Sequence, residues 1–139
     1  MTADLRSERS LHACVDPTCL DKVHELLAEL WTEAADVADV DRTLFELAVM
    51  EVAGNIVQHS VSDDVILCNL HVQVFDTRLD ALFLDTAQEV IVNLTAAHLP
   101  DDMAESGRGL AMTIGAVDQL SYQREGALNC WRLSRTRTG

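Results

Sequence analysis

The stretch from Phe45 to Ser60 constrains the fold most, because its apolar residues repeat at the spacing of an α-helix. At about 100° per residue, four of these residues fall within a sector of roughly 60°, which is the width of a core-facing stripe. Glu51 and Asn55 lie one turn apart and off that stripe. We therefore expect a helix over residues 42–60 that packs on another layer and carries an acid and an amide at its border with solvent. The stripe consists of Phe45, Val49, Val52 and Ile56.

The pair of Glu51 and Asn55 has two interpretations. A carboxylate beside an amide oxygen can hold a hard cation such as Mg²⁺, or orient a water molecule, next to a ligand phosphate. The pair can also be the solvated edge of an amphipathic helix, which is the commoner meaning of this spacing when it stands alone. A second motif is needed before the pair indicates a site.

Two further segments carry residues suited to a nucleotide. Gly107 and Gly109 precede an apolar helical pattern, so backbone N–H groups and a helix N-terminus there can approach an anion. A Gly-x-Gly sequence alone is usually only a turn. Asp85 ends an apolar strand pattern that begins at Leu82, where its carboxylate can accept a hydrogen bond from the amino group of a base or cap the turn.

In this order and at this spacing, the three segments resemble the GHKL (Bergerat-fold) ATPase domains, specifically the small bacterial anti-sigma factor serine/threonine kinases. The resemblance extends from about Leu11 to Leu133. It implies that Glu51 acts as the general base and that Asn55 binds Mg²⁺. It further implies that ATP is bound by Asn55, His59, Asp85 (which would read adenine), Ala87, Gly107, Arg108, Gly109 and Leu110.

The function that this resemblance implies is an ATP- and Mg²⁺-dependent anti-sigma factor that phosphorylates a serine of an anti-sigma factor antagonist. Transcription would then be controlled by partner switching between the sigma factor and the antagonist. The resemblance also implies a homodimer. A detached ATPase domain of a two-component histidine kinase is a weaker alternative, because we expect no dimerisation helix with a phosphoacceptor histidine before the domain.

One departure from the family pattern follows the strand-end aspartate, which the family usually continues as Asp-x-Gly. Here the tripeptide is Asp85-Thr86-Ala87. If the turn needs a positive φ, a Cβ at this position costs on the order of 1 kcal/mol or more. The chain also has Glu105 where some members carry a basic residue just before the second glycine box. Ala87 and Glu105 favour a second hypothesis beside the kinase: a catalytically weak or inactive partner-binding regulatory module on the same fold.

Charge narrows the class of partner. The formal net charge is −13, and the segment from Ser10 to Gly107 contains nineteen acidic residues but only three lysines and arginines. Such a surface repels phosphate backbones, so we expect no direct binding to nucleic acid. It suits a basic protein partner, or it serves solubility alone. Arg132, Arg135 and Arg137 form a short basic end, which we expect to be a solvated tail.

Targeting signals are not evident in the sequence. The longest apolar runs fall far short of the roughly 20 residues needed to cross a bilayer. The N-terminal residues lack an apolar signal core, and the four cysteines show no tight pairing pattern. We expect a cytoplasmic protein that does not bind membranes.

The whole pattern predicts one domain over residues 1–139, with a motif core at about 42–118. Its fold class is an α/β (α+β) two-layer sandwich, in which helices pack on one face of a mostly antiparallel mixed sheet. The loop 88–106 is long enough to be an ATP lid. We expect strands at about 10–15, 66–75, 79–85, 120–124 and 127–135, and helices at about 16–35, 42–60 and 108–119.

Overall fold

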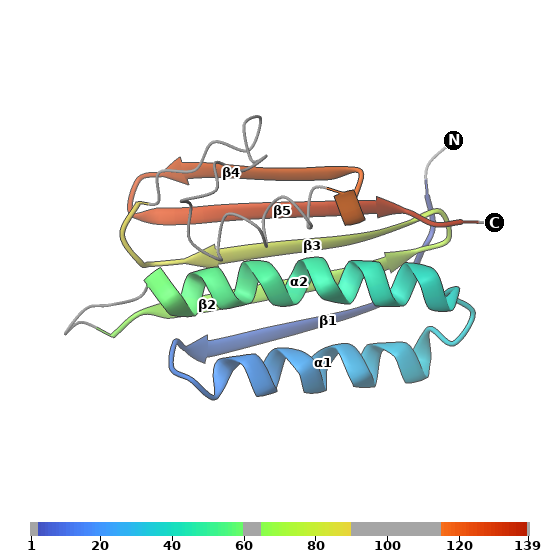
Figure 1. Ribbon diagram of the computed structural model, residues 1–139, viewed down its shortest axis with the longest axis horizontal. Helices are drawn as coiled ribbons and strands as arrows, with labels where there is room; N and C mark the ends of the chain where they lie inside the picture. The colour runs from blue at the N-terminus through green and yellow to red at the C-terminus, as the bar shows by residue number, and fades with distance from the viewer. Residues whose placement is uncertain (1–2, 60–64, 90–114, 139) are drawn as a thin grey trace, which may run out of the picture.

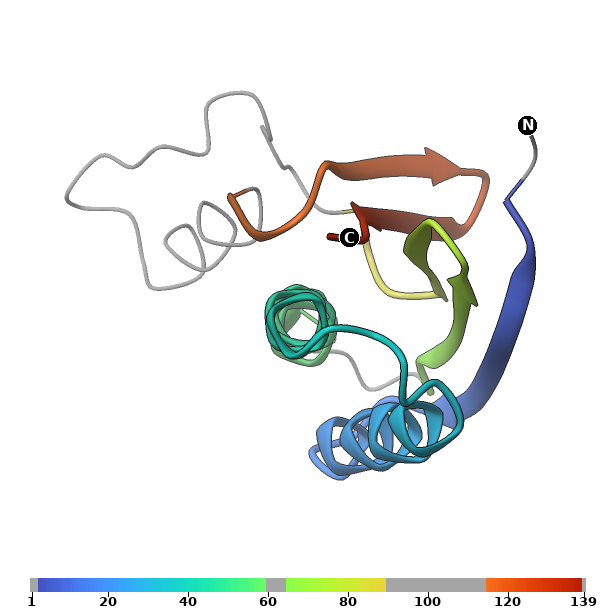
Figure 2. The same cartoon turned by 90° about the vertical axis from the view of Figure 1, so that its right-hand side faces the viewer.

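The structure is a computed structural model that describes residues 3–59, 65–89 and 115–138. It has two layers, a β-sheet and a pair of helices that lie on the same side of that sheet (Figures 1 and 2). The elements in chain order are β1 (Leu5–Cys14), α1 (Cys19–Glu33), α2 (Asp39–His59), β2 (Leu67–Phe75), β3 (Arg78–Asp85), β4 (Gln119–Glu125) and β5 (Leu128–Thr136).

The sheet has the strand order β1-β2-β3-β5-β4, and each neighbouring pair among these strands is antiparallel. The predicted two-layer α+β sandwich with helices on one face is confirmed. The expected sheet was mostly antiparallel, and the described sheet is antiparallel throughout. Tight turns at residues 76–77 and 126–127 join consecutive strands, and such short connections permit only antiparallel pairing.

The core lies between the helices and the inner face of the sheet. The stripe predicted on α2 is confirmed, because Phe45, Val49 and Val52 have no solvent exposure and Ile56 is 4% exposed. α1 packs on β1 and on α2, and α2 also packs on β3 and β5. Alternate residues of the strands complete this core, among them Leu70, Val72, Val74, Leu79, Ala81, Phe83, Trp131 and Leu133.

Element boundaries differ from the sequence prediction at three places. β1 begins at Leu5 rather than near residue 10, because the whole segment pairs with β2. α1 begins at Cys19, since Asp16 instead closes a turn in which its carboxylate accepts the Thr18 N–H at 2.7 Å. α2 begins at Asp39, because acids in a first helical turn complement the helix dipole.

The third predicted helix, 108–119, lies largely outside the described residues. Gly115 and Ala116 are helical, and β4 begins at Gln119. The helix therefore ends before residue 119, because the Asp118 N–H donates to the Ser134 carbonyl at 2.9 Å and brings the chain into register with β5. Most of the predicted lid, residues 90–106, also lies outside the described residues.

The prediction of a solvated basic end is wrong for two of its three arginines. Arg137 donates to the Phe75 carbonyl at 2.9 Å and to the Asp36 carboxylate at 3.0 Å. Arg135 has a side chain that is 14% exposed and pairs with a buried acid of α2. Only Arg132 is exposed as expected. The acids that bind the other two lie far away in sequence, so local pattern gave no sign of them.

Candidate functional site

The amide of Asn55 is oriented by its own helix. Its side chain is 5% exposed, and Nδ2 donates to the Glu51 backbone carbonyl at 2.9 Å. Only the amide nitrogen can donate to a carbonyl, so Oδ1 points the other way. Oδ1 accepts no hydrogen bond from the described residues, and an amide oxygen is a ligand of the kind that Mg²⁺ takes.

The Glu51 carboxylate lies beside this amide, with Oε1 3.5 Å from Asn55 Nδ2. The side chain is half-buried. Burial raises the pKa of Glu51, and the contact with Asn55 lowers it in part. A carboxylate with a raised pKa is a better proton acceptor when it is ionised, which is the property that a general base needs.

Asp85 ends β3 on the inner face of the sheet and is 1% exposed. Its Oδ1 accepts the Ala87 N–H at 3.0 Å and the Asn129 Nδ2 at 2.8 Å. Its Oδ2 is buried without a hydrogen-bond partner among the described residues, and so is Nε1 of Trp131. A buried unpaired polar atom is costly unless a water or a ligand satisfies it.

The charge state of Asp85 reflects this environment. Burial raises the pKa of Asp85, whereas Asn129, the Ala87 N–H, the Trp131 indole and the Arg124 charge lower it. The indole acts here through proximity, because its N–H does not meet hydrogen-bond geometry with the carboxylate. A further hydrogen-bond donor that reaches Oδ2 would therefore stabilise the ionised carboxylate.

Ala87 fits its turn without backbone strain. Gly126 has a φ of 60°, and no other residue of the described segments has a positive φ. The condition under which a Cβ would be costly at this turn is therefore not met. Ala87 is 3% exposed, and its carbonyl accepts a hydrogen bond from Arg124 at 2.8 Å.

The two halves of the predicted site lie on elements that pack together. α2 contacts β3, and the C-terminal ends of both elements lie at the same end of the molecule (Figure 1). His59 is the last residue of α2, but its side chain is not among the described atoms. The second glycine box also lies outside the described residues: Gly107, Arg108, Gly109 and Leu110.

Sequence reasoning missed Asn129 and Arg124, which hold the turn after Asp85. Asn129 is directly opposite Asp85 in the register of β3 and β5. Its signal was an asparagine inside a strand pattern, where this residue type is depleted. Pattern alone did not reveal the strand register, so the pairing of Asn129 with Asp85 was not predictable.

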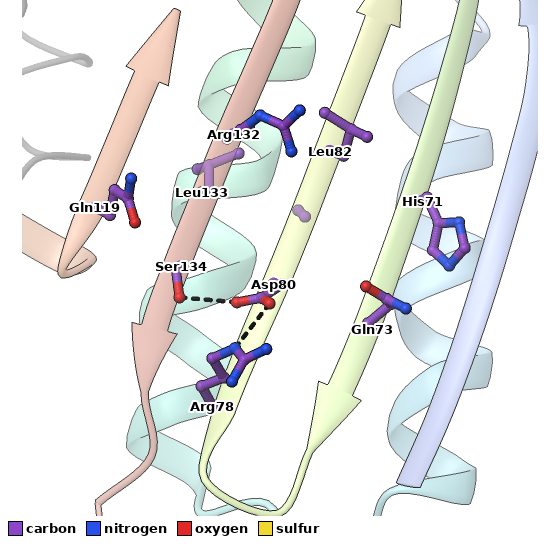
Figure 3. A pocket seen from close by; sticks show the side chains of 10 residues that line it. His71, Gln73, Arg78, Asp80, Leu82, Gln119, Arg132, Leu133 and Ser134 are labelled. Carbon is purple, nitrogen blue, oxygen red and sulfur yellow. Dashed lines mark hydrogen bonds and ion pairs between the residues drawn. The ribbon is translucent and has the colours of Figure 1, made fainter. Parts of the chain in front are cut away.

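A hollow of about 410 Å³ lies elsewhere, on the face of the sheet turned away from the helices (Figure 3). Outward side chains of β2, β3 and β5 line it, including His71, Asp80 and Arg132. Asp80 accepts hydrogen bonds there from Arg78 and Ser134. The inward side chain of Asp85 is on the opposite face, so this hollow does not belong to the predicted site.

Two classes of feature are absent from the described segments. No group of three or more His, Cys, Asp or Glu side chains there could hold a metal ion. No helix within these segments has the length and apolar character needed to cross a membrane.

Among solved structures, the chain is similar to the RsbU and RsbW domains of Rv1364c from Mycobacterium tuberculosis. The TM-score is 0.66, with 19% identity over 94% of this chain and 33% of that chain. It is also similar to the histidine kinase domain of the Erythrobacter litoralis EL346 blue-light activated histidine kinase, with a TM-score of 0.52 and 18% identity over 69% of this chain and 47% of that chain. At these identities the likeness shows the GHKL-type fold.

The chain spans about a third of the length of the first of these structures and about half of the second. No curated protein sequence matches it significantly. The family model for a histidine kinase-like ATPase domain matches residues 15–135. Because this match extends over most of the sequence, the chain belongs to the histidine kinase-like ATPase domain family.

Proposed function

We propose that this protein is an ATP-binding anti-sigma factor with serine/threonine kinase activity toward an anti-sigma factor antagonist. Membership of an ATPase family supports nucleotide binding. The order of the motifs resembles that of anti-sigma factor kinases, and similarity to a structure that contains an RsbW domain supports the same choice. Transcription is then controlled when the protein exchanges the antagonist for its sigma factor.

The observation that carries the proposal is the buried Oδ2 of Asp85, which has no hydrogen-bond partner among the residues that the structure describes. The exocyclic amino group of adenine is a donor that would satisfy this oxygen. Oδ1 is already occupied by two donors, so one acceptor remains for the base. The residues at this end of β3 therefore fit an adenine nucleotide.

The phosphate end of the site is assigned to α2 and to the second glycine box. Asn55 Oδ1 would hold Mg²⁺, which neutralises phosphate charge as the transferred group moves. Glu51 would accept the proton of the substrate serine hydroxyl. Ala87 would lie near the base. His59 and the residues of the second glycine box would contact the phosphates, the box being Gly107, Arg108, Gly109 and Leu110.

The remaining parts of the proposal concern assembly. Residues 1–139 act as one domain, and the segment 88–106 covers the nucleotide. The protein works as a cytoplasmic homodimer that binds a sigma factor and the antagonist, without binding nucleic acid or a membrane. The strong negative charge favours basic surfaces on those partners.

The test is phosphoryl transfer to purified anti-sigma factor antagonists in the presence of Mg-ATP, with phosphoserine detected by mass spectrometry. The kinase proposal expects modification of one serine on a cognate antagonist, and none with a non-hydrolysable ATP analogue. ATP binding with an antagonist complex but without phosphoserine would instead support the partner-binding regulatory module.

A further inference from the structure

Asn129 is fully engaged by the turn that follows Asp85. Both side chains are 1% exposed. Asn129 Nδ2 lies 2.8 Å from Asp85 Oδ1, 2.9 Å from the Gln88 carbonyl and 3.2 Å from the Ala87 carbonyl. Two amide hydrogens thus serve three acceptors. No donor capacity is left with which Asn129 could contact a ligand itself.

The other end of this amide is held by β4. Asn129 Oδ1 accepts hydrogen bonds from Arg124 Nη1 at 3.0 Å and from the Tyr122 hydroxyl. Arg124 is fixed in turn by the carbonyls of Ala87 at 2.8 Å and Gly126 at 3.1 Å. A reversed amide would place its oxygen against three oxygens and its nitrogen against two donors. Only one orientation of Asn129 is therefore compatible with its surroundings.

This arrangement makes the two oxygens of Asp85 unequal. Oδ1 receives both available donors, one from Asn129 and one from the Ala87 backbone, while Oδ2 receives none from the described residues. The hydrogen bond from Asn129 opposes the effect of burial, which raises the pKa of Asp85. Asn129 thus favours the ionised carboxylate and fixes the plane in which it lies.

We propose that Asn129 is the positioning residue that holds the Asp85 carboxylate with Oδ2 as its one open acceptor, and that it thereby sets a preference for adenine over guanine. Adenine presents an amino group at position 6, whereas guanine presents a carbonyl oxygen there. A guanine carbonyl would leave Oδ2 unpaired and facing another acceptor, which is a strong basis for rejection. The base preference rests on the proposed ATP binding, but the effect of Asn129 on the carboxylate does not.

The experiment compares wild type with Asn129→Ala, Tyr122→Phe and the control Gln123→Ala. Gln123 is exposed on β4, next to Tyr122 but on the other face of the sheet. NMR titration follows the Asp85 carboxyl carbon, and calorimetry gives the dissociation constants of Mg-ATP and Mg-GTP. These two measurements separate the carboxylate from the nucleotide.

Asn129→Ala should raise the pKa of Asp85 above its wild-type value and weaken Mg-ATP binding about tenfold, as for the loss of one charge-assisted hydrogen bond. Mg-GTP binding should change less, so the preference for ATP should narrow. Tyr122→Phe should shift both readouts in the same direction by a smaller factor, because it only loosens Asn129. Gln123→Ala should change neither.

A folded Asn129→Ala protein with an unchanged Asp85 pKa and an unchanged ATP-to-GTP ratio would overturn the inference. If Asn129→Ala does not fold, the same two measurements are made on Tyr122→Phe. The inference is then overturned if both the Asp85 pKa and the ATP-to-GTP ratio stay at their wild-type values. If wild type binds neither nucleotide, the proposed function fails. The NMR titration then still decides whether Asn129 controls the Asp85 carboxylate.

Discussion

Asp41 and Arg135 form an ion pair across 94 residues of sequence, with Nε 3.0 Å from Oδ1. The Asp41 side chain has no solvent exposure. Its Oδ2 also accepts the Thr138 N–H at 2.9 Å and the Thr138 hydroxyl at 3.0 Å. Arg135 Nη1 donates to the Ala116 carbonyl at 2.8 Å. The first turn of α2 is thus tied to the end of β5 and to the residues that lead into β4.

Arg135→Ala should lower the free energy of unfolding by about 3–5 kcal/mol, because it leaves the buried Asp41 carboxylate without its cation. Arg132→Ala is the matched control on the same strand, since Arg132 is exposed and has no ion pair among the described residues. That control should change stability by no more than about 0.5 kcal/mol. Urea unfolding measures both, and equal effects would contradict a structural role for the pair.

Asp85→Asn should change how stability depends on pH. Burial raises the pKa of Asp85 in the folded protein. The protonated side chain therefore contributes to the free energy of unfolding below the ordinary aspartate pKa of about 3.9, and this contribution is lost as pH rises through the raised pKa. The asparagine of the variant does not titrate, so its contribution to stability does not change over this pH range. The unfolding free energy of Asp85→Asn should therefore rise relative to that of wild type as pH increases above about 4. Parallel pH profiles in urea unfolding would show that Asp85 is not held at a raised pKa.

Ala87→Gly tests whether the departure from Asp-x-Gly weakens nucleotide binding. The described backbone has no positive φ at Ala87, so glycine relieves no strain. It should lower the unfolding free energy by about 0.4–1 kcal/mol through the entropy of the unfolded chain, and leave the dissociation constant of Mg-ATP unchanged within about twofold. Clearly tighter ATP binding would show instead that the Ala87 Cβ crowds the nucleotide.

Glu51→Gln should slow phosphoryl transfer to a cognate antagonist by about 10²–10⁴-fold, because it removes the proton acceptor and keeps the side-chain shape. Mg-ATP affinity should hardly change. Asn55→Ala provides the contrast, since it should weaken Mg-ATP binding itself. Equal single-turnover rates for wild type and Glu51→Gln would exclude Glu51 as the base.

Local sequence pattern predicted the features that depend on neighbouring residues. The helical repeat identified the buried face of α2, and the apolar run before Asp85 identified the end of β3. Both follow from spacing within one element. The predicted strands at 120–124 and 127–135 placed a connection at residues 125–126, and the φ of 60° at Gly126 in that turn suits glycine.

Contacts between distant elements could not be predicted in this way. Asn129 reaches Asp85 only because two strands 44 residues apart pair in one particular register. Arg135 forms a partly buried ion pair only because Asp41 lies buried near the start of α2. Sequence spacing carries no information on either pairing, so the supports of the site emerged only from the three-dimensional arrangement.

If the C-terminal end of β3 belongs to an adenine-nucleotide site, the protein must bind Mg-ATP, and isothermal calorimetry measures that binding. We expect binding with a dissociation constant in the micromolar to millimolar range, roughly −4 to −8 kcal/mol. Asp85→Asn serves as the matched variant and should bind more weakly, because its amide oxygen would stay with the Asn129 and Ala87 donors and an NH₂ group would replace Oδ2 opposite the adenine amino group. No heat and no thermal shift for wild type at several millimolar Mg-ATP would show that Asp85 does not belong to an adenine-nucleotide site.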